Sequence, residues 1–117
     1  MIPEKETLTI EFKSDIQKIQ ESEIFEAVVA FANTDGGDIY IGVENNGRVT
    51  GVHEKHNNPV MLSAYVANNT VPPISVRIEM LKVYFSRRRH ESASYIRPKR
   101  LSGFKEAFRR RQAGTGE

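Results

Sequence analysis

The sequence Phe31-Ala-Asn-Thr-Asp-Gly-Gly-Asp-Ile-Tyr-Ile-Gly-Val43 contains a helix end, a glycine turn and a buried strand. The apolar helical face before the turn ends at Asn33, and Gly36-Gly37 supply the positive φ angles that a helix exit needs. The apolar, β-branched and aromatic run that follows predicts a strand over residues 38–44. A glycine inside this run, Gly42, indicates a bulge or a close approach of another backbone segment. The residues assigned to this structural turn are Asn33, Asp35, Gly36, Gly37 and Gly42.

The spacing of apolar residues predicts the elements that come before this joint. Residues 6–13 alternate as a strand that points Leu8, Ile10 and Phe12 inward. Ser22 is the predicted N-cap of the helix, because acidic residues follow it in the first turn and suit the positive end of the helix dipole. The chain is therefore expected to enter the glycine turn from a strand and an amphipathic helix.

Turn signals separate the elements that follow the central strand. The run Glu44-Asn-Asn-Gly-Arg48 predicts a hairpin turn, and residues 48–52 are the expected returning strand. Asn58-Pro59 predicts the start of a second helix, since Asn caps well and Pro suits the first helical position. This helix is expected to end at Asn68-Asn69.

The last third of the chain begins with a regular pattern and then becomes basic. Residues 74–80 alternate as a half-buried strand, and the alternation slips phase at Met80-Leu81, which predicts a bulge or a turn. Residues 93–96 are a candidate final strand. Phe104 and Phe108 could lie on one short helical face, with a strand or a tail as alternatives.

The predicted order β-α-β-β-α-β, with a further β at the end, is a mixed sheet with two main helices packed on it, in the α+β class. A length of 117 residues indicates a single domain over residues 1–117, with a core over 5–85 and a basic segment over 86–117. The absence of cysteine excludes disulfide bonds and thiol chemistry and fits a reducing cytoplasm. Because no apolar run is long enough to span a bilayer, we expect a cytoplasmic protein with no membrane partner.

The charge is divided unequally between the two halves of the sequence. Residues 1–60 carry 5 Lys/Arg and 11 Asp/Glu, a net charge of −6, whereas residues 61–117 carry 12 and 4, a net charge of +8. Such asymmetry indicates a polyanionic partner for the basic half, and arginine, which predominates there, suits phosphate geometry. The alternative is that the halves neutralise each other within the fold or across a homodimer.

Three motifs occur together in residues 5–80: Glu11-Phe12-Lys13, the stretch 31–43 and Gly47-Arg-Val-Thr-Gly-Val52. In this combination the chain resembles the Schlafen AlbA-type DNA-binding domain family of bacterial transcriptional regulators and helicase-related proteins. The resemblance implies an Alba-like fold and nucleic-acid binding, DNA rather than RNA. Similar sequences have also been described as divergent ATPases, but the chain contains no Walker-type phosphate loop, so we expect no ATP hydrolysis.

The same resemblance implies an enzymatic alternative, a metal-dependent endonuclease with no further cofactor. The family's three acidic positions correspond here to Glu6, Glu11 and Glu44, with Glu44 standing where the family site has Asp. Carboxylates of this kind bind Mg²⁺ or Mn²⁺, which activate water and clamp phosphate oxygens. A regular strand would place Glu6 and Glu11 on opposite faces, so a shared ion requires a bulge or a Glu6 outside the strand. His53-Glu-Lys-His56 lacks a third metal ligand and is expected to be a polar loop.

The preferred interpretation is a binding domain without catalytic residues or a cofactor, which contacts phosphates through its basic half. Tyr95 and Phe104 interleave with the basic clusters as candidate stacking platforms. A third interpretation is a scaffold whose basic segment pairs with an acidic protein or with a second copy. The candidate phosphate-binding residues are Arg77, Arg87, Arg88, Arg89, Arg97, Lys99, Arg100, Arg109, Arg110 and Arg111.

Overall fold

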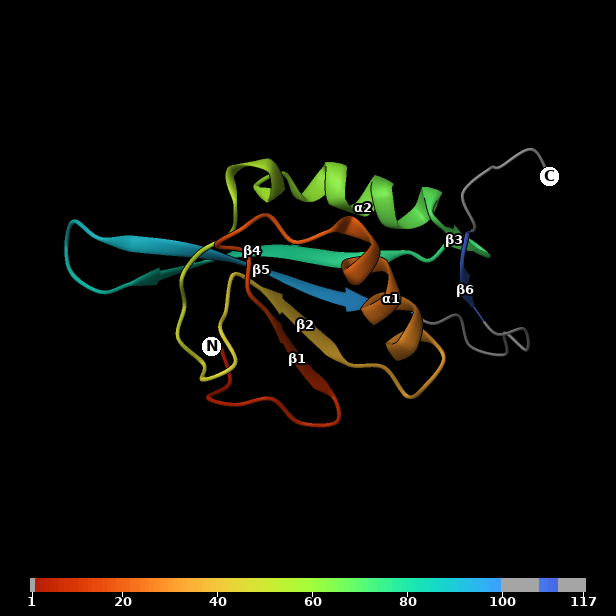
Figure 1. Ribbon diagram of the computed structural model, residues 1–117, viewed down its shortest axis with the longest axis horizontal. Coiled ribbons are helices and arrows are strands. Elements are labelled where there is room, and N and C mark those ends of the chain that lie inside the picture. Colours follow the sequence, from red (N-terminus) through yellow and green to blue (C-terminus); the bar gives the residue numbers. More distant parts are fainter. Residues whose placement is uncertain (1, 100–107, 112–117) are drawn as a thin grey trace.

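The computed structural model describes residues 2–99 and 108–111, which are arranged as shown in Figure 1. Among these residues, four strands form one sheet in the order β1-β2-β5-β4; β1 and β2 are parallel and the other neighbours are antiparallel. A second, two-stranded sheet pairs β3 with β6. The elements in chain order are β1 (Ile10–Lys13), α1 (Glu21–Ala32), β2 (Asp38–Ile41), η1 (Glu54–His56), α2 (Pro59–Asn68), β3 (Thr70–Val71), β4 (Val76–Tyr84), β5 (His90–Pro98) and β6 (Arg109–Arg110).

Both helices pack on one face of the four-stranded sheet, which confirms the predicted α+β class. The apolar residues of α1 and α2 recur at helical spacing, so each helix presents one buried stripe to the sheet. The strands contribute side chains of alternating positions to the same core, because successive side chains point to opposite faces. The core residues of this face include Ile24 and Val28 of α1, Leu62 and Val66 of α2, and Ile39, Ile41 and Ile96 of the sheet.

The opposite face of the sheet carries a second, smaller apolar cluster. Phe12, Tyr40, Val43 and Ala93 are buried there, and the ring centroids of Phe12 and Tyr40 lie 6.1 Å apart in an edge-to-face arrangement. Ile2, from the start of the described chain, packs against this cluster. The two faces therefore differ: helices cover one, whereas the other is covered in part by loops and by the N-terminal segment.

The glycines of the helix–strand joint have distinct roles. Gly36 has φ = 100°, as predicted, but Gly37 does not need a positive φ; a Cβ at Gly37 would lie 2.5 Å from the ring of Phe31. Gly42 combines φ = 92° with an approach to Gly51, where an added Cβ would be 2.7 Å from the backbone carbon. The close backbone approach predicted at Gly42 is confirmed, and it is the Gly51 segment that approaches.

The N-terminal strand and helix begin at different residues from those predicted. The strand starts only at Ile10, because a turn between Thr7 and Ile10 precedes it, and Leu8 is 98% exposed rather than inward. The helix starts at Glu21, with Gln20 rather than Ser22 at the N-cap position and no side-chain cap hydrogen bond. The strand predicted from alternation over residues 6–13 was therefore too long at its N-terminal end. The polar residues around Leu8 favour a turn equally well.

Two predictions about the later strands were wrong. Residues 48–52 form no ladder strand; one isolated bridge joins Val43 to Val49. The phase slip at Met80-Leu81 produces neither a bulge nor a turn, because β4 pairs with β5 without interruption from Val76 to Tyr84. The slip instead marks a change of face: Val76 and Ile78 pack against the core on the helix side of the sheet, whereas Leu81 packs against the second apolar cluster on the opposite side.

The second helix and the final strand were predicted well. The Asn58 side chain accepts a hydrogen bond from the Met61 N–H at 3.2 Å, and Pro59 is the first helical residue. The candidate strand over 93–96 is the centre of β5, which lies between β2 and β4. The predicted Phe104 face lies outside the described residues. Phe108 is buried, and its backbone exchanges hydrogen bonds with the Asn33 side chain at 2.6 and 2.7 Å.

The β4–β5 hairpin extends past both helices, at the left of Figure 1. We call its outer part, residues 83–91, the arm, and the rest of the described chain the body. The long axis of the molecule measures 50 Å, and β6 lies toward the end opposite the arm (Figure 1). No helix in the described part of the chain is long and apolar enough to cross a membrane.

Candidate nucleic-acid interface

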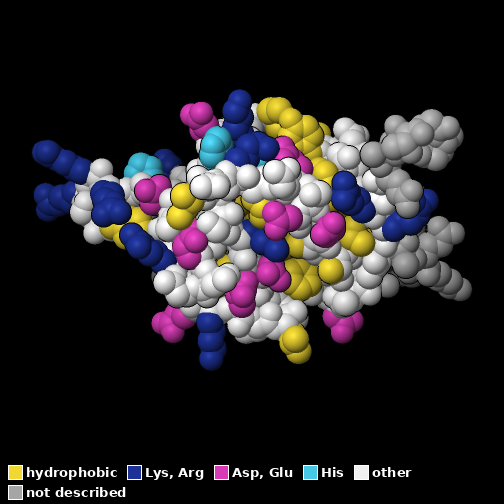
Figure 2. All heavy atoms as spheres, viewed as in Figure 1, with side chains coloured by type: hydrophobic (Ala, Val, Ile, Leu, Met, Phe, Trp, Pro, Cys, Tyr) yellow, Lys and Arg dark blue, Asp and Glu magenta, His cyan; other side chains and the backbone are white. Residues whose placement is uncertain are grey.

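Two clusters of the predicted basic residues lie at opposite ends of the molecule. Arg87, Arg88 and Arg89 form the tip of the arm, where Figure 2 shows Lys and Arg side chains gathered at the left. Arg109 and Arg111 lie in and beside β6, at the other end of the molecule. The face seen in Figure 2 carries several acidic side chains between these ends. The two arginine triplets of the sequence, residues 87–89 and 109–111, therefore lie at opposite ends of the domain.

The tip of the arm is exposed and held by its own turn. The Phe85 N–H donates to the Arg89 carbonyl oxygen at 2.9 Å and so closes the turn. The Arg89 guanidinium lies 5.2 Å from the centre of the Phe85 ring, a cation–π contact. Arg87 and Arg88 are exposed and form no ion pair with any described residue. The tip therefore presents guanidinium groups whose charge no described carboxylate compensates.

Three of the other candidate arginines already have acidic partners. Arg97 donates to Asp38 at 2.9 Å, and its hydrogen bonds with Tyr95 and Asp38 raise the pKa of its guanidinium group above its ordinary value. The remaining pairs are Arg77 with Glu79 at 2.7 Å and Arg110 with Glu26 at 3.6 Å. Because exposed ion pairs contribute little, these partners can be exchanged for phosphate, but the local charge is close to neutral. Lys99 is exposed just after β5, and Arg100 lies outside the described residues.

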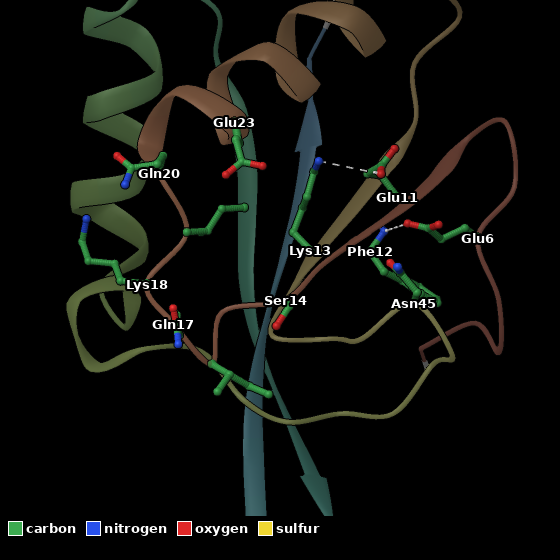
Figure 3. A pocket seen from close by; sticks show the side chains of 12 residues that line it. Glu6, Glu11, Phe12, Lys13, Ser14, Gln17, Lys18, Gln20, Glu23 and Asn45 are labelled. Carbon is green, nitrogen blue, oxygen red and sulfur yellow. Dashed lines mark hydrogen bonds and ion pairs between the residues drawn. The ribbon is translucent and has the colours of Figure 1, made fainter.

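Glu6 and Glu11 come together at one side of a polar hollow, which Figure 3 shows. Glu6 lies outside β1, and one of its carboxylate oxygens accepts a hydrogen bond from the Phe12 N–H at 2.8 Å. Burial raises the pKa of Glu11; Lys13, 3.9 Å away, lowers it, and the neighbouring Glu6 raises it further. A regular strand would place Glu6 and Glu11 on opposite faces of the sheet. They can lie together here because Glu6 lies outside β1.

The third predicted acid does not join this pair. Glu44 does not line the hollow, and its carboxylate accepts a hydrogen bond from the Thr50 hydroxyl at 2.6 Å. No group of three or more His, Cys, Asp and Glu side chains within residues 2–99 and 108–111 is arranged to hold a metal ion. The three matched positions therefore do not fit one divalent ion in this arrangement.

Asp15 and His56 form a buried polar centre that the sequence patterns did not predict. One carboxylate oxygen of Asp15 accepts from the Ile19 N–H at 2.8 Å; the other contacts His56 Nδ1 at 2.8 Å and accepts from the His53 N–H at 2.7 Å. Both Asp15 and His56 are 1% exposed. The segment 53–56 is thus anchored to the body rather than being a free polar loop, and only the separation of 41 residues concealed the pair.

Comparison with known proteins identifies the family of this chain. A search of curated proteins gave no significant match. The family model described as "Schlafen, AlbA_2" matches residues 6–97, which include β1 to β4 and nearly all of β5. The chain therefore belongs to the Schlafen AlbA_2 family.

Proposed function

We propose that this domain binds DNA through the tip of the arm, as the DNA-contacting part of a transcriptional-regulator type protein. The Schlafen AlbA_2 domain is often linked to nucleic-acid binding. The observation that carries the proposal is the set of three arginines, Arg87 to Arg89, at the exposed end of a projecting hairpin. Arginine donates to phosphate oxygens through a planar fork, and clustered arginines release counterions when they bind DNA.

The shape of the arm supports DNA rather than RNA as the partner. The arm is a two-stranded antiparallel ribbon, and the major groove of B-form DNA is wide enough to admit such a ribbon. The major groove of an A-form RNA helix is deep and narrow and excludes side chains. A duplex that receives the arm would contact the tip arginines first and leave the acidic surface of the body outside the groove.

The interactions expected at the tip would be directed mainly at the DNA backbone. Phosphate contacts fix the position of a protein on the duplex but carry little sequence information. Each arginine–phosphate interaction that a mutation removes is expected to reduce the slope of log affinity against log salt by about 0.9. The number of phosphate contacts made by the tip arginines and by residues 109–111 can therefore be compared from the change in this slope.

Fluorescence anisotropy with a labelled DNA duplex, over roughly 50–300 mM salt, tests the proposal. Replacement of Arg87, Arg88 and Arg89 by Ala should weaken binding at least about tenfold at low salt and reduce the slope by about 2 to 3. The matched control replaces Arg109, Arg110 and Arg111 by Ala, which also removes three charges. An equal loss in both variants would indicate general electrostatic attraction and would contradict a role for the arm.

The same anisotropy measurements, together with light scattering, distinguish the scaffold interpretation from DNA binding. If no nucleic acid binds at low salt, while light scattering shows self-association that salt disperses, the proposal fails and pairing between copies is favoured. Cleavage of the labelled duplex in the presence of Mn²⁺ would revive the endonuclease alternative, which the position of Glu44 does not support.

A further inference from the structure

The sheet face opposite the helices carries two regular rows of side chains. Strand register places Phe12 beside Tyr40, Tyr40 beside Tyr95, and Tyr95 beside Glu79. The aromatic members of this row come from three neighbouring strands, β1, β2 and β5. No described helix covers this row, because α1 and α2 both pack on the other face.

The second row is polar and lies directly beside the aromatic one. Arg97 stands opposite Arg77 in the β4–β5 ladder, so two guanidinium groups lie next to each other on this face. The side chains of Arg77 and Arg97 are 58% and 50% exposed. Like charges directly opposite in a ladder are unfavourable, and an anion placed between them removes that cost.

Tyr95 joins the two rows. Its ring centroid lies 5.2 Å from that of Tyr40, which is itself buried, and its hydroxyl donates to Asp38 at 2.6 Å. Arg97 donates to the same Asp38 oxygen at 2.9 Å. The Tyr95 ring is therefore held on one side by the neighbouring Tyr40 ring and at its hydroxyl by Asp38, while the residue stays partly exposed. A rigid, partly exposed aromatic ring beside two guanidinium groups matches the composition of a base-stacking platform.

We propose that this face binds single-stranded nucleic acid, with one unpaired base stacked on Tyr95 and the flanking phosphates contacted by Arg77 and Arg97. The inference rests on the proposed function, which it deepens by naming a second site and its substrate class. A duplex keeps its base faces stacked inside the helix, so only an unpaired base can reach Tyr95. We call the surface formed by Tyr95, Arg77 and Arg97 the platform. The platform is therefore expected to bind single strands, and the arm is expected to bind duplex DNA.

The charge of the platform distinguishes it from the arm in an experiment. Arg77 and Arg97 are paired with Glu79 and Asp38, so the platform has no net charge. The stacking contribution of Tyr95 should depend little on salt, whereas the uncompensated tip arginines should give most of the salt dependence. Tyr95→Leu is expected to lower affinity at all salt concentrations without changing the slope.

The test compares oligothymidylate of about 12 nucleotides with a duplex of the same length, both labelled for anisotropy. Tyr95→Leu should weaken oligothymidylate binding about fivefold or more, with an unchanged salt slope and little effect on the duplex. Tyr95→Phe retains the ring and should stay within about twofold of the unchanged protein. Tyr65→Leu, an exposed tyrosine of α2 on the helix side, is the matched control. Arg77→Gln, at an exposed position, should weaken oligothymidylate about twofold to threefold without affecting folding.

Each remaining outcome decides the inference. If Tyr95→Leu and Arg77→Gln bind oligothymidylate as well as the unchanged protein, while the arm variant still loses duplex binding, the platform is refuted and the proposed function stands. Equal losses for duplex and oligothymidylate in Arg77→Gln would also refute it. If neither probe binds the unchanged protein at low salt, the proposed function fails and the inference fails with it.

Discussion

The arm and the body share the strands β4 and β5 but differ in what surrounds them. In the body, Ile78 and Ile96 are opposite each other in the ladder and pack with the helices. In the arm, Tyr84 is opposite His90, and both are exposed. The hydrogen-bonded ladder is continuous through both parts, so strand pairing alone does not distinguish them. Burial against the helices makes one part stabilising, and its absence leaves the other available for a partner.

The most direct test of this difference truncates an apolar side chain to Ala in each part. Ile96→Ala, at a fully buried position, should lower the free energy of unfolding by about 2 to 5 kcal/mol. Val83→Ala, in the arm, should lower it by less than about 1 kcal/mol, because less area is buried there. Urea denaturation measures both, and Ile96→Val, with an expected loss of about 1 kcal/mol, remains measurable if the alanine variant unfolds. Equal losses at both sites would mean that the arm is part of the core.

Removal of a buried polar partner in the body should lower the free energy of unfolding about as much as removal of a buried apolar side chain. Asp15→Ala leaves the buried His56 without its partner and two backbone N–H groups without their acceptor, so a loss of about 3 kcal/mol is expected. Asp15→Asn retains an acceptor oxygen and should lose less. The free energy of unfolding from chemical denaturation is the readout. A loss below about 0.5 kcal/mol for Asp15→Ala would show that the pair contributes little to folding.

The tip of the arm should affect binding without affecting folding. Replacement of Arg87, Arg88 and Arg89 by Ala should change the free energy of unfolding by no more than about 0.5 kcal/mol, because these side chains are exposed and none forms an ion pair with a described residue. Denaturation of the variant used for DNA binding measures this directly. A larger destabilisation would mean that the tip supports the body, and weaker binding could then be a consequence of unfolding.

The smallest expected effects concern the pH dependence of two carboxylates in the body. The pKa of folded Glu11 is raised above 4.5, so its ionised form disfavours folding at neutral pH. Glu11→Gln should therefore raise stability at pH 7 by roughly a few tenths of a kcal/mol, since the group is partly exposed. The gain should vanish below a pH of about 4.5, where the carboxyl group is protonated in both states.

Glu21 provides the control of opposite sign. A hydrogen bond from Lys18 lowers the pKa of Glu21 below 4.5, so its ionised form favours folding. Glu21→Gln should slightly lower stability at pH 7, and the loss should disappear as the pH falls through the lowered pKa. Thermal unfolding at neutral and acidic pH reads out both variants. Changes of the same sign at neutral pH would contradict the assigned environments.

The elements that could be predicted from the sequence are those specified by short segments. The capping of α2 by Asn58 needs only residues within one turn of the helix. The α+β class followed from the order of apolar patterns, and the close approach at Gly42 from a glycine inside an apolar run of the sequence. Predictions failed where one pattern suits two structures, as with Leu8, whose alternating neighbours also form a turn.

Local sequence was sufficient to specify the helix–glycine–strand joint, the second helix, the fold class and the arginine content of the candidate interface. The tertiary structure was needed to establish which arginines lie together, that Asp15 meets His56, and that Glu44 stays apart from Glu6 and Glu11. The physical reason is the range of the interactions. Caps, turns and periodicity depend on neighbours in the chain, whereas strand register brings together residues that the sequence separates, such as Asp38 and Arg97.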